Sequence, residues 1–436
     1  SKELKRFRNQ RIKKSVRTNF SEAVICRLAD SKRVAASVLV VSALSAASAY
    51  ALPQGGNVVA GSASISTSGS TTMLINQATN RAIVDWNKFN INANELVKFM
   101  QPGRASVILN KVIGADPSSI LGALQANGRV FLVNPNGIVF GHSATVDVAG
   151  LVATTFDIKN SDFMNGNYVF NQDANKNLSY VINKGKIKIS DNGFVFLVAP
   201  SVSNEGLIVA NLGKAVLGSG KGLTVDFFGD GTITYSVTGK VLDQVEGPNG
   251  QPLTTAVSNS GKIKADGGQI ILTANAANTI LSSVVNNSGI IEAKSLVNKD
   301  GQVVLEGNKD GAVINTGTID ASSAEAGASG GSISLQGEYV GNSGTISADG
   351  KTNADGGNIL LKSGKETLVV AGSLISADGI GENSNGGEIR ILSDMDSGLS
   401  AVTAGAALSA KGGITGDGGF VEVSGHGFHL GDASID

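Results

Sequence analysis

Few side chains in this 436-residue chain have the types and spacing that catalysis requires. The best pair of carboxylates is Asp226 and Asp230, which stand four residues apart and could share one strand face as general acid and base. Gly229 and Gly231 flank the second carboxylate, however, and glycines at such positions favour a turn. We therefore predict no catalytic residues and no enzyme.

Candidate metal ligands are equally sparse. His426 and His429 have the spacing of a metal pair on a helix, but on a strand an offset of three places them on opposite faces. We expect His142 to be a solvent-facing loop residue. The Gly-Gly-x-Gly-x-Asp repeat of calcium-binding β-rolls does not occur, so Asp266-Gly-Gly and Asp355-Gly-Gly are interpreted as ordinary turns. The sequence predicts no metal site and no cofactor.

A two-part phrase that recurs six times shapes the second half of the chain. Its first part sets a large aliphatic residue two positions before an alanine, and the copies follow one another about every 28 residues. These pairs are Ile263/Ala265, Ile291/Ala293, Ile319/Ala321, Ile346/Ala348, Ile375/Ala377 and Leu408/Ala410. The second part is a Gly-Gly or Asp-Gly pair and a short apolar run, first at residues 267–272. Such a period is typical of a solenoid, in which each repeat buries its apolar face against its neighbours.

Alternation within the phrase identifies the repeating unit as a set of strands. The residue between each aliphatic and its alanine is polar, so one strand face would be buried and the other exposed. Asn and Gly would supply the corners, because both tolerate positive φ, and no stretch has helical spacing. Glycine is abundant at 57 residues, and only 16% of residues are charged against a usual share of about 25%. The sequence therefore predicts an all-β fold, a right-handed parallel β-helix with an N-terminal capping region.

The first 51 residues have the features of an extended secretory signal peptide. A long basic region precedes the apolar run 34–47, and Ala49-Tyr50-Ala51 fits a small-x-small cleavage site. Residues 1–33 hold 11 of the 35 Lys and Arg but only 3 of the 36 Asp and Glu, so the remainder carries a net charge of about −9. Nucleic acid is therefore not an expected partner.

Residues 52–160 lack the tandem phrase but carry a series of short motifs. They include Asp85-Trp86, Val107-Ile-Leu-Asn110 and Asn134-Pro135-Asn136-Gly137-Ile138. In this order they resemble the secretion domain of two-partner secretion exoproteins, the family of filamentous haemagglutinin and the high-molecular-weight adhesins. The Asn-Pro-Asn-Leu motif of the haemagglutinin branch is absent, which favours the adhesin-like branch. We accordingly divide the chain into a signal peptide (1–51), a secretion domain (52–160) and β-helix rungs (161–436).

The resemblance implies a route of export and a set of partners. Such proteins cross the inner membrane through the Sec translocon, and an outer-membrane Omp85-type β-barrel transporter with POTRA domains then recognises them in the periplasm. The exported rod reaches the bacterial surface, where we expect an adhesin that binds a host-cell receptor or surface glycan. The alternative is an export and stalk module for a cytolysin, contact-dependent toxin or haem-acquisition activity in a C-terminal region beyond Asp436. A β-helical polysaccharide lyase or hydrolase fits less well.

Two interpretations of the motif residues remain open. Asn134-Pro135-Asn136-Gly137 carries the residues favoured at the four positions of a type I turn, with strands expected at 130–133 and 138–140. The motif could be a structural corner, or it could contact the transporter together with Ile138. Trp86 and Asn110 belong to a secondary family motif, and we expect Trp86 in the core of the cap, although an exposed tryptophan could serve docking.

Overall fold

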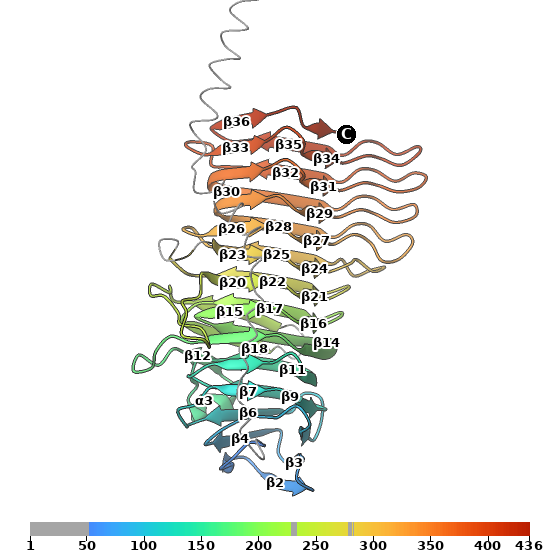
Figure 1. Cartoon of the computed structure of the whole chain (residues 1–436). Helices are drawn as coiled ribbons and strands as arrows, with labels where there is room; N and C mark the ends of the chain where they lie inside the picture. Colours follow the sequence, from blue (N-terminus) through green and yellow to red (C-terminus); the bar gives the residue numbers. More distant parts are fainter. Residues whose placement is uncertain (1–51, 228–232, 278–280, 282) are drawn as a thin grey trace, which may run out of the picture.

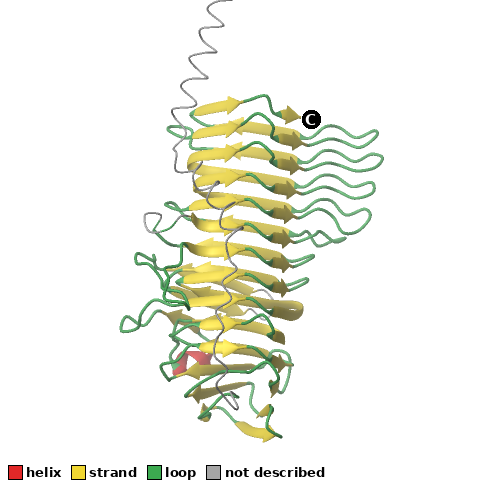
Figure 2. Ribbon diagram, viewed as in Figure 1, coloured by secondary structure: helices red, strands yellow, loops and turns green. Residues whose placement is uncertain are grey.

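A computed structural model describes residues 52–227, 233–277, 281 and 283–436 of the chain. Within this part, three stacks of parallel strands close into a three-sided β-helix (Figures 1 and 2). From β7 onward each complete turn of the coil contributes strand residues to all three stacks, and the turns stack along a single axis. The prediction of an all-β parallel β-helix is confirmed.

The first face carries the repeated aliphatic–alanine phrase. Its strands are β3 (Thr72–Gln77), β5 (Leu96–Met100), β8 (Ala123–Ala126), the first parts of β11 (Thr145–Thr154) and β14 (Lys186–Ala199), β16 (Leu207–Val209), β21 (Lys262–Lys264), β24 (Ile290–Glu292), β27 (Thr318–Asp320), β29 (Thr345–Ser347), β31 (Leu374–Ser376), β34 (Ala407–Ser409) and β37 (Ser434–Ile435). Equivalent positions pair directly, as Ile263 does with Ile291 and Ile291 with Ile319.

The second face carries the short runs that follow the Gly-Gly or Asp-Gly pairs. Its strands are β4 (Arg81–Trp86), β6 (Val107–Val112), β9 (Arg129–Val133), the later parts of β11 and β14, β17 (Lys214–Ser219), β22 (Gln269–Ala274), β25 (Gln302–Glu306), the first parts of β28 (Ser332–Asn342) and β30 (Asn358–Val369), β32 (Glu388–Leu392) and β35 (Phe420–Ser424).

The third face closes each turn. Its strands are β7 (Ser118–Ile120), β10 (Ile138–Phe140), β13 (Tyr180–Asn183), β15 (Ser201–Asn204), β20 (Thr255–Asn259), β23 (Ser283–Asn287), β26 (Ala312–Asn315), the later parts of β28 and β30, β33 (Leu399–Val402) and β36 (Gly427–Leu430). The core therefore lies between the three sheets, and each added rung extends it along the axis without making it wider.

Antiparallel elements cap the N-terminal end and cover part of the second face. β1 (Asn57–Ala60) pairs antiparallel with β4, and β2 (Ala63–Ser68) pairs antiparallel with β3. Outside the coil, α3 (Asn160–Asn165) precedes a three-stranded antiparallel sheet of β12 (Tyr168–Asn171), β18 (Gly222–Phe227) and β19 (Ile233–Thr238). None of the described helices has the length and apolar composition to cross a membrane.

The spacing of apolar residues did not indicate the short helix α3. A helix of six residues is too short to show a 3.6-residue periodicity, and Gly166 ends it with a φ of 85° in the left-handed region. The covering sheet also interrupts the expected run of rungs after residue 160. Large apolar side chains require this cover, because Phe131, Phe194 and Phe196 point out of the second face into a separate buried cluster with Phe163 and Tyr168.

The alternation inside the repeat sorts side chains as predicted. All six large aliphatic residues of the phrase and their alanines are buried, at 0% to 2% exposure. The polar residue between them lies on the outer surface of the first face and is partly exposed in five copies; only Ser376 is buried. Burial of an aliphatic side chain contributes about 1.5–3 kcal/mol before the loss of conformational entropy, so each rung adds to the core of the rung below it.

An asparagine ladder runs up the corner between the third and first faces. The side-chain amide of each asparagine donates to the carbonyl of the asparagine one rung on, with Nδ2–Oδ1 distances of 2.7 to 2.8 Å. The ladder consists of Asn183, Asn204, Asn259, Asn287, Asn315 and Asn342, each fully buried. We expected asparagine at these corners because it tolerates a positive φ. That expectation is wrong, because none of these six residues has a positive φ. Their amides instead join adjacent rungs.

The glycine two residues after each ladder asparagine is required for a related reason. Gly289 has no positive φ, but a β-carbon at this position would lie 2.1 Å from the carbonyl oxygen of Gly261 in the preceding rung. Gly317 meets Gly289 in the same way, at 2.1 Å. These positions therefore require glycine because the backbones of adjacent rungs lie close together, and not because the residue has a positive φ. Gly267 in the second part of the phrase does have a φ of 63°, as the turn interpretation predicts.

We predict that Asn287→Ala destabilises the described rod by about 1–3 kcal/mol, since it leaves buried amide groups of Asn259 and Asn315 without their partners. Chemical denaturation followed by circular dichroism measures the loss as a lower midpoint. Asn358→Ala is the matched control, because Asn358 is exposed at the start of β30 and lies outside the ladder, and its effect should stay within about 0.5 kcal/mol. Equal midpoints for the two variants would contradict a stabilising ladder.

Candidate functional site

The Asn-Pro-Asn-Gly motif forms a tight turn at the corner between the second and third faces. β9 ends at Val133 and β10 begins at Ile138, so both flanking strands lie where the sequence placed them. The amide of Gly137 donates to the carbonyl of Asn134 at 3.1 Å, which closes a four-residue turn. The structural interpretation of the motif as a corner is therefore supported by its geometry.

The Asn134 side chain is the internal brace of this turn. It is fully buried, and its Nδ2 donates to the Asp116 carbonyl and to Ser118 Oγ, both at 3.0 Å. Its Oδ1 accepts from the backbone amide of Asn136 and from Asn136 Nδ2, again both at 3.0 Å. These four hydrogen bonds leave no exposed part of Asn134 for a partner to contact.

The remaining motif residues divide between the core and the surface. Gly137 has a φ of 115°, and a β-carbon there would lie 2.8 Å from Ser179 Oγ, so only glycine fits. Ile138 is fully buried in the core. Pro135 and Asn136 are partly exposed, and Asn136 Nδ2 also donates to the Gly114 carbonyl at 2.9 Å. A partner at this corner could therefore contact only Pro135 and Asn136 among the five.

A surface hollow of about 370 Å³ adjoins these two residues. Its walls come from four segments that the coil brings together: Ala115 and Pro117, Pro135 and Asn136, residues 175–180, and Glu246 with Gly247. Sequence reasoning did not assign the last two segments to this corner, because both lie far from the motif along the chain. Only the stacking of β13 on β10 places residues 175–180 beside the turn.

Trp86 and Asn110 lie on neighbouring strands of the second face and meet inside the cap. Trp86 Nε1 donates to Asn110 Oδ1 at 3.0 Å, and both side chains are fully buried. The Trp86 ring also packs edge-on against Phe89, with centroids 5.5 Å apart. The expectation of a core tryptophan is confirmed, and this pair is a structural element of the cap.

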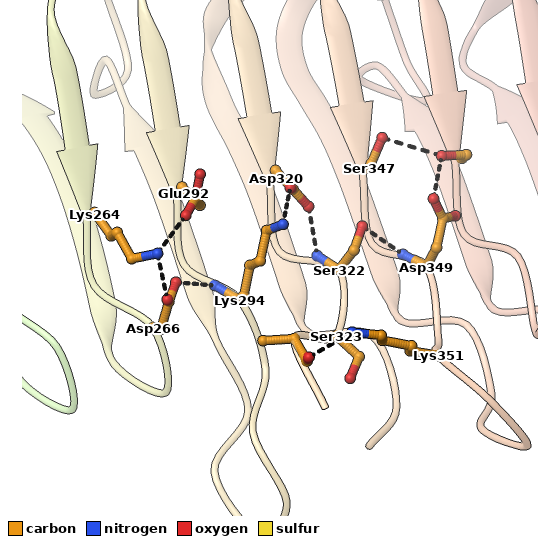
Figure 3. A network of polar contacts seen from close by, with 12 residues as sticks. Lys264, Asp266, Glu292, Lys294, Asp320, Ser322, Ser323, Ser347, Asp349 and Lys351 are labelled. Carbon is orange, nitrogen blue, oxygen red and sulfur yellow. Dashed lines mark hydrogen bonds and ion pairs between the residues drawn. The ribbon is translucent and has the colours of Figure 1, made fainter. Parts of the chain in front are cut away.

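A second polar constellation runs along the outer end of the first face (Figure 3). Lys264 Nζ lies 2.7 Å from carboxylate oxygens of both Asp266 and Glu292, and Lys294 Nζ lies 3.3 Å from Asp320. The Lys264 ammonium donates hydrogen bonds to both carboxylates, and these bonds raise the pKa of Lys264. Burial disfavours the charged form of Glu292, but hydrogen bonds from Lys264 and Lys262 outweigh it and lower the pKa of that carboxyl.

Further along this face, neutral donors bind the carboxylate of Asp349. Asp349 accepts hydrogen bonds from the Asp378 amide at 2.8 Å and from Ser376 Oγ at 3.0 Å. Burial nevertheless raises the pKa of the Asp349 carboxyl, and the negative charges of Asp378 and Asp320 add to the effect. Among the described residues, no group of three or more His, Cys, Asp or Glu side chains could hold a metal ion. We interpret these contacts as rung-to-rung links.

The other residues singled out in the sequence do not gather into a site. Asp226 lies exposed on β18 in the covering sheet, while Asp230 falls outside the described residues. His429 lies on β36, and His426 lies exposed in the preceding bend. His142 is exposed in the loop after β10, as expected. The signal cleavage residues Ala49 and Ala51 lie outside the described residues.

Asn110→Ala should destabilise the cap by about 1–3 kcal/mol, because it leaves the buried indole N–H of Trp86 without an acceptor. Trp86 is the single tryptophan of the chain, so the midpoint of its fluorescence transition in denaturant reports on the cap directly. Asn76→Ala, at an exposed position of β3, serves as the control and should leave the midpoint in place. A variant Asn110→Ala that unfolds with the parent would refute the bracing role.

Asp349→Asn should raise the melting temperature at pH 7 and have little effect at pH 3. A carboxyl whose folded-state pKa lies above its ordinary value of 3.8 makes ionisation costly to the fold, so this cost is present above the raised pKa and absent below 3.8. Thermal melts at the two pH values test the sign. Asp147→Asn, which removes an exposed carboxylate from β11, controls for net charge. A lower melting temperature at pH 7 would contradict the prediction.

Comparison with known proteins places these observations in a family. Residues 49–321 match the model of the TPS secretion domain. The crystal structure of the HMW1 secretion domain from Haemophilus influenzae is 30% identical, with a TM-score of 0.72 over 88% of this chain and 100% of that domain. Two heme/hemopexin-binding proteins of Haemophilus influenzae are also similar. One is 41% identical over 267 residues, which make up 59% of this chain and 28% of that protein. The other is 29% identical over 292 residues, 61% of this chain and 30% of that protein.

The chain thus spans less than a third of the length of these curated relatives. The family match, by contrast, covers more than half of the chain and includes the cap, the Asn-Pro-Asn-Gly corner and the covering sheet. The chain belongs to the family of two-partner secretion exoproteins and carries their TPS secretion domain.

Proposed function

We propose that the N-terminal rungs of this chain are the part that its outer-membrane transporter recognises, and that Pro135 and Asn136 lie in the contact. A TPS secretion domain implies secretion across the outer membrane through a cognate transporter. What supports this location is the division of labour within the motif: Asn134, Gly137 and Ile138 are buried and build the corner, whereas the two central residues reach the surface beside a hollow.

We include the whole export route in this proposal. Residues 1–51 act as the signal peptide for the Sec translocon and are removed after Ala51. The POTRA domains of an Omp85-type transporter then bind the secretion domain in the periplasm, and the rod emerges at the cell surface. The stacked architecture supports export that starts at the N-terminal end. A β-helix forms by stacking neighbouring turns, so the emerging rod can grow one rung at a time.

Two activities are candidates for the exported protein. An adhesin for a host-cell receptor or surface glycan is the first, supported by the likeness to the HMW1 secretion domain. Capture of haem or hemopexin is the second, and it is favoured by 41% identity to a heme/hemopexin-binding protein. Both activities belong to the whole exoprotein rather than to the secretion domain. Binding of purified hemopexin to the secreted protein, measured directly, distinguishes the second candidate from the first.

The transporter contact predicts that Pro135→Ala/Asn136→Ala reduces the secreted protein at least about tenfold in cells that express the transporter. Secretion should fall because the double variant lacks the exposed side chains that would contact the transporter. The turn itself should persist, because Asn134 keeps its hydrogen bonds to Asp116 and Ser118. Secretion is measured by immunoblot of culture supernatant and cell fractions. Pro248→Ala/Asn249→Ala is the matched control, because the same residue pair occupies an exposed turn that does not line the hollow.

Folding of the purified double variant separates the two interpretations of the motif. If its Trp86 fluorescence and denaturation midpoint match those of the parent while secretion falls, the corner is a contact site. If secretion falls only together with the midpoint, the corner is structural and the proposed contact is wrong. Undiminished secretion would also rule out the contact.

A further inference from the structure

A second hollow, of about 610 Å³, opens at the start of the second face, at the opposite end of those strands from the Asn-Pro-Asn-Gly corner. Its lining includes Arg81 at the start of β4, Arg129 at the start of β9, Tyr168 of β12 and Phe227 of β18. The loop at Pro102 and Gly103 forms part of its wall. Stacking of three rungs and docking of the covering sheet bring these distant segments together, and the proposed export function does not use them.

The described residues that line this hollow carry charge of one sign. They include Arg81 and Arg129, and none of them is an Asp or Glu. In the part of the chain that the structure describes, the Arg129 guanidinium has no hydrogen-bond acceptor or ion-pair partner in contact with it. Its contacts are the faces of two rings, with the Phe227 centroid at 4.3 Å and the Phe194 centroid at 5.6 Å. A guanidinium has five N–H donors, so Arg129 is equipped to bind an acceptor from outside.

The second arginine is already held in position. Arg81 Nε donates to the Tyr168 hydroxyl at 3.1 Å, and Nη1 donates to the Met164 carbonyl at 3.4 Å. These bonds use two of its five donors and fix the plane of the group. Gly166 keeps that space open, because a β-carbon there would lie 2.9 Å from Arg81 Nη2. A rigid, partly satisfied guanidinium loses little side-chain entropy when it binds a ligand.

Burial makes the unpaired charge costly to the protein. The partly buried position of Arg129 lowers the pKa of its guanidinium; the Tyr168 side chain opposes this shift, and the nearby positive charge of Arg104 adds to it. An anion in the hollow would offset both the burial and the repulsion. The aromatic and apolar walls, Phe227, Tyr168, Val107 and Ala105, favour a ligand whose anionic group is attached to an apolar body.

We propose that this hollow binds an acidic side chain of a partner polypeptide, flanked by an aromatic or other apolar residue. The two guanidinium groups would hold the carboxylate, and the rings of Phe227 and Tyr168 would contact the neighbouring side chain. An extended polyanion such as nucleic acid is disfavoured, because the chain after residue 33 carries a net charge of about −9 and would repel it outside the pocket. The volume of about 610 Å³ is large enough for an acidic side chain and its apolar neighbours.

The test compares two peptides that differ in one charge, acetyl-Phe-Asp-Phe-amide and acetyl-Phe-Asn-Phe-amide. Isothermal titration of the exported protein should give at least about tenfold tighter binding of the acidic peptide, the difference expected for charge-assisted hydrogen bonds, and this preference should weaken as NaCl is raised. Arg129→Gln should remove the preference. Lys98→Gln, an equal charge change at an exposed position of β5, should preserve it.

Each other outcome decides against the proposal. Equal affinity for the two peptides, or an unchanged preference in Arg129→Gln, overturns it. Binding of inorganic phosphate without binding of the acidic peptide shows a simple anion site and also overturns it. Trp86 fluorescence confirms that Arg129→Gln is folded; should that variant unfold, Arg129→Lys, which keeps the charge but loses the planar fork, must still reduce the preference. Normal secretion of Arg129→Gln leaves the transporter contact at Pro135 and Asn136 unaffected, so the two proposals fail separately.

Discussion

In-register stacking of one turn of the chain on the next is the constraint on which the rest of this structure depends. A strand of three to six residues cannot bury its apolar face or satisfy its backbone alone, so every rung requires its neighbour. Ile263, Ile291 and Ile319 meet because their strands pair position for position. The asparagine ladder adds to this register, since each buried amide binds its equivalent one rung away. A slip of one residue would bury the polar face instead.

The same constraint explains where the regular pattern is broken. Among the described residues the first rung has a rung on one side only, and β1 and β2 cover its other end by antiparallel pairing, which protects an otherwise open edge. Along the second face, outward-pointing phenylalanines would be exposed without α3, β12, β18 and β19. Irregular elements therefore lie where the coil alone cannot cover apolar surface, and both hollows form at their margins.

Both proposed contact sites lie at corners and margins of the coil rather than on the faces of the strands. The side chains of the strands pack in the core or make contacts between rungs. These contacts include the ion pairs of Lys264 with Asp266 and Glu292, and of Lys294 with Asp320. The Asn-Pro-Asn-Gly turn presents Pro135 and Asn136 at the surface, because Asn134 and Gly137 are buried. Under the proposed function, recognition and architecture use different residues of one motif, and for that reason Pro135 and Asn136 can be tested without removing the brace at Asn134.

The sequence alone determined the solenoid, its all-β class and the inward face of each repeat, because a period of about 28 residues and strict alternation are local properties of the chain. It also located the turn at 134–137 and the burial of Trp86. It did not determine that Trp86 binds Asn110, that the repeat asparagines form a ladder, or that glycines are required by a backbone one rung away. Those contacts, the short helix α3 and the arginines of the second hollow join residues that are far apart in the chain, and only the stacking of rungs brings such residues within bonding distance.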